Sequence, residues 1–100
     1  MNLFVLYPQP IDVNKFEEDY VGHIALFHEK THIPVHVKPY TITKFISQPG
    51  STSPYYQMFT MPFESAEALY EAMSSPGMLE IAADANRISS GGAPVVLIGE

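Results

Sequence analysis

The segment LFVLYPQPIDVNKFEEDYVGHIALF, residues 3–27, contains the pattern of a β-strand followed directly by an α-helix. The apolar run Leu3–Tyr7 stops at two closely spaced prolines, which is typical of a strand that ends in a turn. Asp12 then stands at a helix N-cap position, and four large residues follow at steps of four, four and three: Phe16, Tyr20, Ile24 and Phe27. This spacing places them on one face of a helix. Pro34 disfavours helical geometry in the residue before it, so the helix must end by Ile33.

Two further strands are predicted in the middle of the chain. Alternation rich in β-branched and aromatic residues predicts a long strand over Val37–Ser47 and a second strand over Tyr55–Phe63. The intervening segment Gln48–Pro54 is rich in Pro, Gly and Ser, which predicts a loop, so the two strands are expected to form a hairpin. Alternation in the second strand places Tyr56 and Met58 on one face, and it leaves open which face lines a pocket.

The last third of the chain predicts a broken helix and a final strand. Ser65 is the N-cap of a first piece and Ser75, followed by Pro76, is the N-cap of a second piece. Each piece has an apolar stripe at helical spacing, made of Ala66, Leu69, Tyr70 and Met73 in the first and Met78, Ile81, Ala82, Ala85 and Ile88 in the second. After the turn Ser89–Gly92, the run Ala93–Ile98 predicts a strand.

The resulting order, β-α-β-β-α-β, predicts the α+β class and a ferredoxin-like sandwich, in which helices cover one face of a four-stranded antiparallel sheet. A chain of 100 residues is expected to form a single domain, residues 1–100. The other face of the sheet stays uncovered, and candidates to line it are Phe4, Leu6, Val95, Leu97 and residues of the central hairpin. A contiguous apolar face marks an interface, and two such faces can pair through one two-fold contact. We therefore expect a homodimer formed through the open sheet face.

Composition excludes several classes of protein. The chain has no cysteine, which excludes disulfides and thiolate chemistry and favours a reducing, cytoplasmic location. The net charge is −6 and the five Lys and Arg residues are scattered, so nucleic acid is not an expected partner. No apolar run approaches the ~20 residues of a membrane helix, and the first residues lack the pattern of a signal peptide. No membrane partner is expected.

Five blocks of the sequence resemble proteins of the EthD type. Leu6–Pro10 with Asp12 and Phe16-x-x-x-Tyr20 resembles the opening of that family, and His23-Ile24-Ala25-Leu26 is similar to its His-x-Pro-Leu signature. The later blocks are Pro54-Tyr55-Tyr56, Phe63-Glu64-Ser65-x-x-Ala68-Leu69 and Ile88–Val95. Together the blocks cover essentially the whole chain in the order of the family. Two departures are Ala25, where the family usually has Pro, and a step of three residues from Tyr20 to His23, where the family usually has four.

The resemblance implies membership of the dimeric α+β barrel superfamily, with a small-molecule pocket in each subunit. EthD relatives are linked to ether degradation, and the wider superfamily contains cofactor-independent monooxygenases, polyketide cyclases and lactone isomerases. The resemblance thus implies an oxidoreductase, an isomerase-like enzyme or an enzyme accessory in the degradation of aromatic or oxygenated organic compounds. One alternative is a non-catalytic ligand-binding or enzyme-partner protein, and another is a structural dimer without a ligand. The chain has no flavin, nicotinamide or haem motif, so no cofactor is expected.

His23 is the main catalytic candidate, because an imidazole can carry a proton near neutral pH. The alternative is a structural histidine at the edge of the core. Tyr20 is the second catalytic candidate, and either Tyr20 or Tyr7 could hold a ligand oxygen through its hydroxyl. The residues expected to bind the substrate are Tyr7, Phe16, Phe27, Tyr56 and Met58.

The remaining histidines do not predict a metal site. His28 and His32 are four residues apart, as zinc ligands often are, but a third ligand at suitable spacing is missing. Pro34 prevents His36 from continuing the same helical row. No metal is expected, and the roles of these three histidines stay open.

Overall fold

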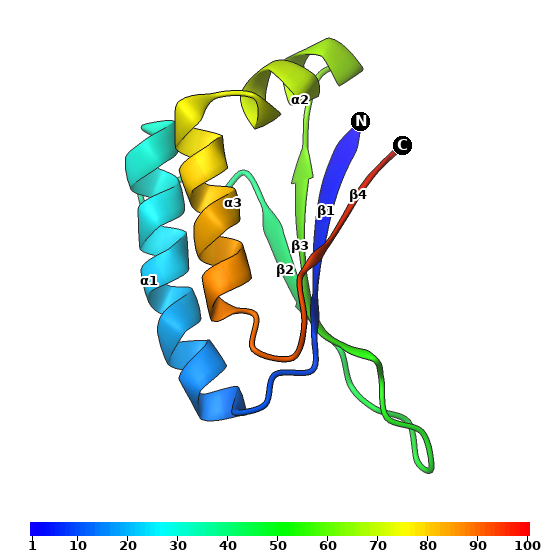
Figure 1. Ribbon diagram of the computed structural model, residues 1–100. Helices are drawn as coiled ribbons and strands as arrows, with labels where there is room; N and C mark the ends of the chain where they lie inside the picture. Colours follow the sequence, from blue (N-terminus) through cyan, green and yellow to red (C-terminus); the bar gives the residue numbers. More distant parts are fainter.

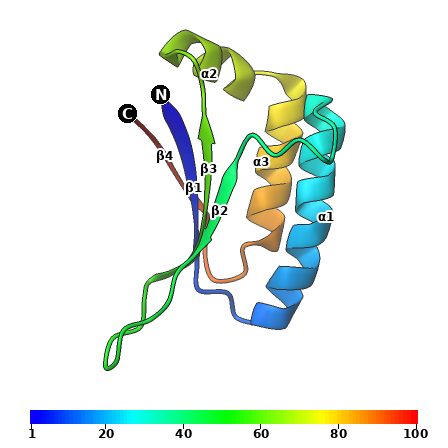
Figure 2. The ribbon, with the colours of Figure 1, turned by 180° about the vertical axis from the view of Figure 1, so that it is seen from behind.

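The chain forms one antiparallel sheet with helices on one side, in a computed structural model that describes residues 1–100. The elements are β1 (Asn2–Pro8), α1 (Val13–Thr31), β2 (Thr41–Lys44), β3 (Tyr55–Pro62), α2 (Ala66–Met73), α3 (Pro76–Ile88) and β4 (Val95–Gly99). The strand order across the sheet is β2-β3-β1-β4. Helices α1 and α3 lie side by side against one face, and no helix covers the other (Figures 1 and 2). The predicted ferredoxin-like sandwich with a broken second helix is confirmed.

The helices begin where the sequence predicts, because each has a side-chain oxygen at its N-cap. Asp12 Oδ1 accepts a hydrogen bond from Lys15 N at 3.1 Å, and Ser65 and Ser75 do the same for α2 and α3. Helix α1 ends at Thr31, and His32 follows with a φ of +60°, the left-handed conformation of a helix C-cap. This end lies before Pro34, as expected.

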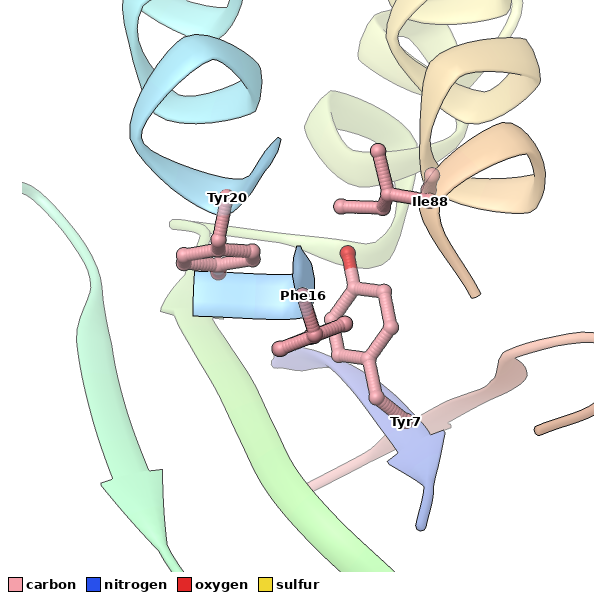
Figure 3. Close-up of a cluster of buried hydrophobic side chains, with 5 residues drawn as sticks. Tyr7, Phe16, Tyr20 and Ile88 are labelled. Atoms are coloured by element: carbon pink, nitrogen blue, oxygen red, sulfur yellow. The ribbon is translucent and has the colours of Figure 1, made fainter. Parts of the chain in front are cut away.

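The core lies between the sheet and the helices and is rich in aromatic side chains. Tyr7 meets Phe16 and Tyr20 edge to face, with ring centroids 5.3 and 5.7 Å apart. Figure 3 shows Tyr7 rising from β1 towards the helices, where Ile88 of α3 closes the cluster. Edge-to-face contacts between aromatic rings are favourable beyond the area that they bury. This cluster joins β1, α1 and α3.

The first strand of the hairpin is shorter than predicted. β2 spans only Thr41–Lys44 instead of Val37–Ser47. The residues before it form a turn in which Val37 N donates to Pro34 O at 2.9 Å. Beyond Lys44, a single bond from Phe45 N to Tyr56 O continues the pairing. The alternating pattern thus runs on into segments that the folded chain uses as a turn and as a projecting loop.

A β-bulge in β3 makes the predicted pairing of Tyr56 and Met58 on one face wrong. Tyr7 lies opposite Gln57 but Pro8 lies opposite Tyr55, so Tyr56 is the extra residue. Its ring contacts Phe16 on the helix side, with centroids 5.5 Å apart. Met58 instead lies opposite Leu6 on the open face. The bulge interrupts the two-residue period on which the prediction depends.

The uncovered face of the sheet carries the apolar residues that the sequence predicts. Phe4 lies opposite Leu97, and Leu6 opposite Val95, on the side away from the buried Leu3 and Tyr7. Leu97 is 52% exposed. Towards β2 the same face becomes polar, with three threonines: Thr41, Thr43 and Thr60. None of the helices is both long and apolar enough to span a membrane.

Candidate functional site

A cavity of about 140 Å³ lies between the sheet and the helices. Hydrophobic residues make up 12 of the 15 that line it, and they come from β1, β3, β4 and all three helices. Among the lining residues, Val96 of the edge strand β4 and Asn86 of α3 are exposed, so the cavity reaches solvent near β4 and α3. A cavity of about 150 Å³ with aliphatic and aromatic walls can hold one benzene-sized molecule. The size and the walls therefore suit a small apolar ligand.

His23 is the only basic side chain that lines the cavity. It is 5% exposed, and its Nδ1 lies 2.9 Å from Asp84 Oδ2 of α3. The carboxylate accepts the Nδ1–H, so the neutral imidazole keeps Nε2 as a free acceptor. The other carboxylate oxygen, Asp84 Oδ1, accepts from Arg87 Nε at 2.8 Å. The carboxylate is thus held from both sides and fixes the imidazole orientation.

The environment keeps His23 neutral and Asp84 ionised at neutral pH. Burial lowers the pKa of His23 below its ordinary 6.5, although the hydrogen bond and the charge of Asp84 act in the opposite direction. Burial also acts to raise the pKa of Asp84, but Arg87 and His23 outweigh it, so this pKa is lowered. The carboxylate of Asp84 offsets part of the cost of protonating the buried imidazole, so His23 can act as a proton acceptor.

We expect His23 to titrate below pH 6.5 and to make the fold less stable in acid. The unfolded chain binds this proton more readily than the folded chain does, so the stability due to neutral His23 is fully present above 6.5. This stability is lost as the pH falls through the lowered pKa of His23.

An NMR titration of the His23 ring measures this pKa, and Asp84→Asn should lower it further because the stabilising carboxylate is removed. Glu80→Gln, on the same helix but facing Lys30, is the control and should leave it unchanged. An unchanged pKa in Asp84→Asn would contradict the assigned contact.

The cavity brings together three of the residues that the sequence singled out, namely Tyr7, His23 and Phe27. Burial raises the pKa of Tyr7, so its hydroxyl stays protonated and can donate a hydrogen bond. Phe16 and Tyr56 pack in the aromatic cluster beside the cavity and do not line it.

Tyr20 also lies outside the lining, although its ring centroid is 5.5 Å from that of His23. Its hydroxyl and Gln57 Nε2 are both buried without a hydrogen-bond partner in the protein. Met58 lies on the open face of the sheet and is separated from the cavity by the sheet itself. Of the residues expected to bind the substrate, Met58 is therefore the one that lies across the sheet from the cavity.

Sequence reasoning missed Asp84. It lies 61 residues after His23, and no spacing rule connects two residues so far apart. One signal was available: Asp84 falls between Ile81 and Ile88 at helical spacing, on the face that α3 buries. An acid within an apolar stripe requires a partner, because burying a charge without one is costly.

His28 has a structural role and does not belong to the cavity. Its Nδ1 donates to Ile33 O at 2.9 Å and its Nε2 accepts from the Tyr40 hydroxyl at 2.8 Å. Both ring nitrogens are therefore occupied, and they tie α1 to the segment that leads into β2. Nowhere in the structure do three His, Cys, Asp or Glu side chains gather around a possible metal position.

Comparisons with solved structures agree on the fold. An ethyl tert-butyl ether D (EthD) family protein from Bacillus halodurans C-125 is 27% identical, and the match covers 99% of this chain and 95% of that one, with a TM-score of 0.78. A protein from Arabidopsis thaliana is 21% identical over 96% and 89% of the two chains, with a TM-score of 0.63. A dimeric ferredoxin-like protein of unknown function from Jannaschia sp. CCS1 is 11% identical over 96% and 94%, with a TM-score of 0.67. No family model matches the chain, and no curated protein sequence does either.

Fold and site together define a small α+β sandwich protein with an apolar cavity between sheet and helices and a histidine–carboxylate pair at its wall. The similarity to the Bacillus halodurans protein extends over nearly the whole of both chains, and the five sequence blocks agree with it. The chain thus has the ferredoxin-like fold of these neighbours and resembles the EthD family protein over nearly its whole length.

Proposed function

We propose that this chain is a cofactor-independent enzyme that transfers a proton on a small aromatic or oxygenated organic molecule, with His23 as the proton carrier. The observation that supports this most is the placement of one buried, neutral imidazole at the wall of an apolar cavity, with Nδ1 held by Asp84 and Nε2 free. The EthD relative is named after ethyl tert-butyl ether, a small oxygenated compound, which agrees with this class of ligand.

The chemistry follows from the free nitrogen. Nε2 accepts a proton from a C–H or O–H group of the ligand, and the Asp84 carboxylate stabilises the imidazolium that forms. Tyr7 donates a hydrogen bond to the ligand oxygen on which negative charge develops. Return of the proton to a different atom of the ligand completes an isomerisation or a cyclisation. A monooxygenase of this type would use the same first step, with molecular oxygen as the oxidant of the resulting anion.

A non-catalytic ligand carrier is the second candidate. It is favoured by the predominance of apolar walls, which leave Tyr7, His23 and Asn86 as the polar groups of the cavity. Such a protein would bind the same ligands but would not need the proton acceptor.

We also infer that two copies of the chain pair through the open sheet face. Phe4, Leu6 and Leu97 form an apolar surface there that no element of the same chain covers (Figure 1). The Jannaschia protein of the same fold is described as dimeric, which supports the inference.

Binding to the cavity can be tested with acetophenone, a one-ring ketone of suitable size. We expect it to shift the NMR signals of His23 and of the cavity methyl groups of Ile24 and Ile81. The methyl group of Met58, on the opposite face of the sheet, is the internal control and should not shift. Shifts confined to residues outside the cavity would contradict both candidate functions.

A further inference from the structure

A second hollow, an open groove of about 490 Å³, lies between α1 and the edge strand β2. Ala25 and His28 of α1 line one side of it, and Val35, Lys38 and Tyr40 of the segment that connects α1 to β2 line the other. Most sites for small molecules have volumes of about 300–1,000 Å³, so the groove is large enough to hold one. It is distinct from the cavity that His23 lines.

The connecting segment, residues 33–40, is a wall with a fixed shape. His28 holds both of its ends, because Nδ1 donates to Ile33 O at 2.9 Å and Nε2 accepts from the Tyr40 hydroxyl at 2.8 Å. Between these ends, Val37 N donates to Pro34 O at 2.9 Å and closes a turn. In Figure 2 the segment runs from the end of α1 back to the edge of the sheet at β2. Since this wall is already ordered, a ligand that enters the groove has little protein to immobilise.

The walls are mostly apolar and are accessible to solvent. Val35 is 71% exposed and Ile42 is 37% exposed, and Ala25 is also exposed. A single exposed aliphatic side chain is ordinary, but these three line the same hollow. Ala25 contributes only a methyl group, which leaves the space between α1 and the connecting segment open. Such walls suit the hydrocarbon part of a ligand.

Lys38 is the only Lys or Arg residue of the chain without an ion pair. The other four each lie 2.6 to 3.0 Å from a carboxylate oxygen of Asp or Glu. The chain has 11 Asp and Glu residues, and none of them pairs with Lys38. Because Lys38 lines the groove, its ammonium group is available to an anion that enters there.

The charge at the groove favours an anion with a single charge. A polyanion such as a nucleic acid needs several cations, and the net charge of −6 repels it. One ammonium group beside aliphatic side chains instead complements one carboxylate attached to an apolar chain or ring. The hydrocarbon part of such a molecule contacts the walls while the carboxylate pairs with Lys38.

We propose that the groove between α1 and β2 binds a small carboxylic acid with an apolar body. The carboxylate pairs with the ammonium group of Lys38, and the apolar body packs against Ala25, Val35 and Ile42. This site does not involve His23, so the proposal is independent of the enzymatic function proposed above.

An NMR titration with octanoate tests the site, and 1-octanol is the ligand control because it has the same chain length but no charge. The methyl signals of Ala25, Val35 and Ile42 report on the groove, whereas that of Ile81 reports on the cavity alone. Ile24 lines both and is not used as a reporter. We expect octanoate to shift the three groove signals and to bind about fivefold more tightly than octanol, which is the upper range for an exposed ion pair.

Two variants, each with a matched control, locate the ligand. Lys38→Gln should raise the dissociation constant of octanoate about fivefold, whereas Lys15→Gln removes a charge that pairs with Asp19 and should leave it unchanged. Ala25→Trp should abolish binding because the indole fills the groove. Leu79→Trp, at a residue that is 60% exposed on α3, should bind octanoate like the wild type. All four positions are exposed, so the melting temperatures should stay close to the wild type.

The outcomes decide between a groove site and the alternatives. Shifts confined to Ile81 would place the acid in the cavity and overturn the groove site, as would the absence of groove shifts at millimolar octanoate. Equal affinity for octanoate and octanol, or an unchanged affinity in Lys38→Gln, would overturn the assignment of a carboxylate to Lys38. Binding that persists in Ala25→Trp would overturn the location. None of these results bears on proton transfer by His23, which the acetophenone experiments test separately.

Discussion

Replacing His23 by Gln should slow the deuterium exchange of the acetophenone methyl group in D2O by about 10²- to 10⁴-fold, the usual contribution of a general base. This exchange requires removal of a C–H proton next to a carbonyl, which is the step assigned to Nε2 of His23. Glutamine keeps a polar side chain at the cavity wall but cannot accept a proton at neutral pH. The rate is followed by the loss of the methyl proton signal.

His28→Gln is a matched control for this experiment. His28 lies on the same helix and has the same 5% exposure as His23, but both of its ring nitrogens are occupied by Ile33 and Tyr40. We expect its exchange rate to stay close to wild type while the protein loses about 1–3 kcal/mol of stability, since buried polar groups lose their partners. If His23→Gln only lowers the melting temperature and leaves exchange intact, His23 is structural and the ligand-carrier function is the better one.

Introducing a carboxylate on the open sheet face should dissociate the dimer. Leu97→Asp places a charge opposite Phe4, where the proposed interface would bury it without a partner. Burial of an unpaired charge costs several kcal/mol, and ~1.4 kcal/mol is a tenfold change in affinity. We therefore expect the dimer dissociation constant to rise by about 10²-fold or more, as measured by sedimentation or by light scattering over a dilution series.

The matched control here is Leu79→Asp, which also changes an exposed leucine. Leu79 is 60% exposed on α3, and Leu97 is 52% exposed on β4, so neither substitution disturbs the core. The two variants should have similar melting temperatures as monomers and differ only in self-association. Equal dissociation constants for the two variants would show that the open face is not the interface.

Most of the elements are readable from short stretches of sequence, because their signals are local. The N-caps at Asp12, Ser65 and Ser75 and the proline after α1 act within one helical turn, and all of them operate in the folded chain. The fold class and the apolar open face follow from the order of these elements and from alternation along β1 and β4. The extent of β2 was not readable, since alternation continues through residues that form a turn and a projecting loop.

The candidate site, too, could be predicted from the sequence only in part. The helical stripe that contains Tyr20, Ile24 and Phe27 placed His23 at the edge of the core, and the family resemblance marked it as a catalytic candidate. Which tyrosine reaches the cavity depends on packing: Tyr7 lines the cavity, whereas Tyr20 stacks beside Phe16 in the neighbouring cluster. Both residues have an aromatic ring and a hydroxyl, so sequence pattern does not distinguish them.

Local chemistry and periodicity were sufficient for the fold class, the helix starts, the apolar open face and the position of His23 at the edge of the core, because each depends on residues a few positions apart. Three features exist only in the folded chain: the contact of His23 with Asp84, the turn of Tyr56 to the helix side at the bulge, and the direction in which the loop of residues 45–54 projects. Each of them depends on groups that are distant along the chain or on one extra residue in a strand. Side-chain packing between sheet and helices sets such distances, and the spacing of residues in a linear sequence does not contain them.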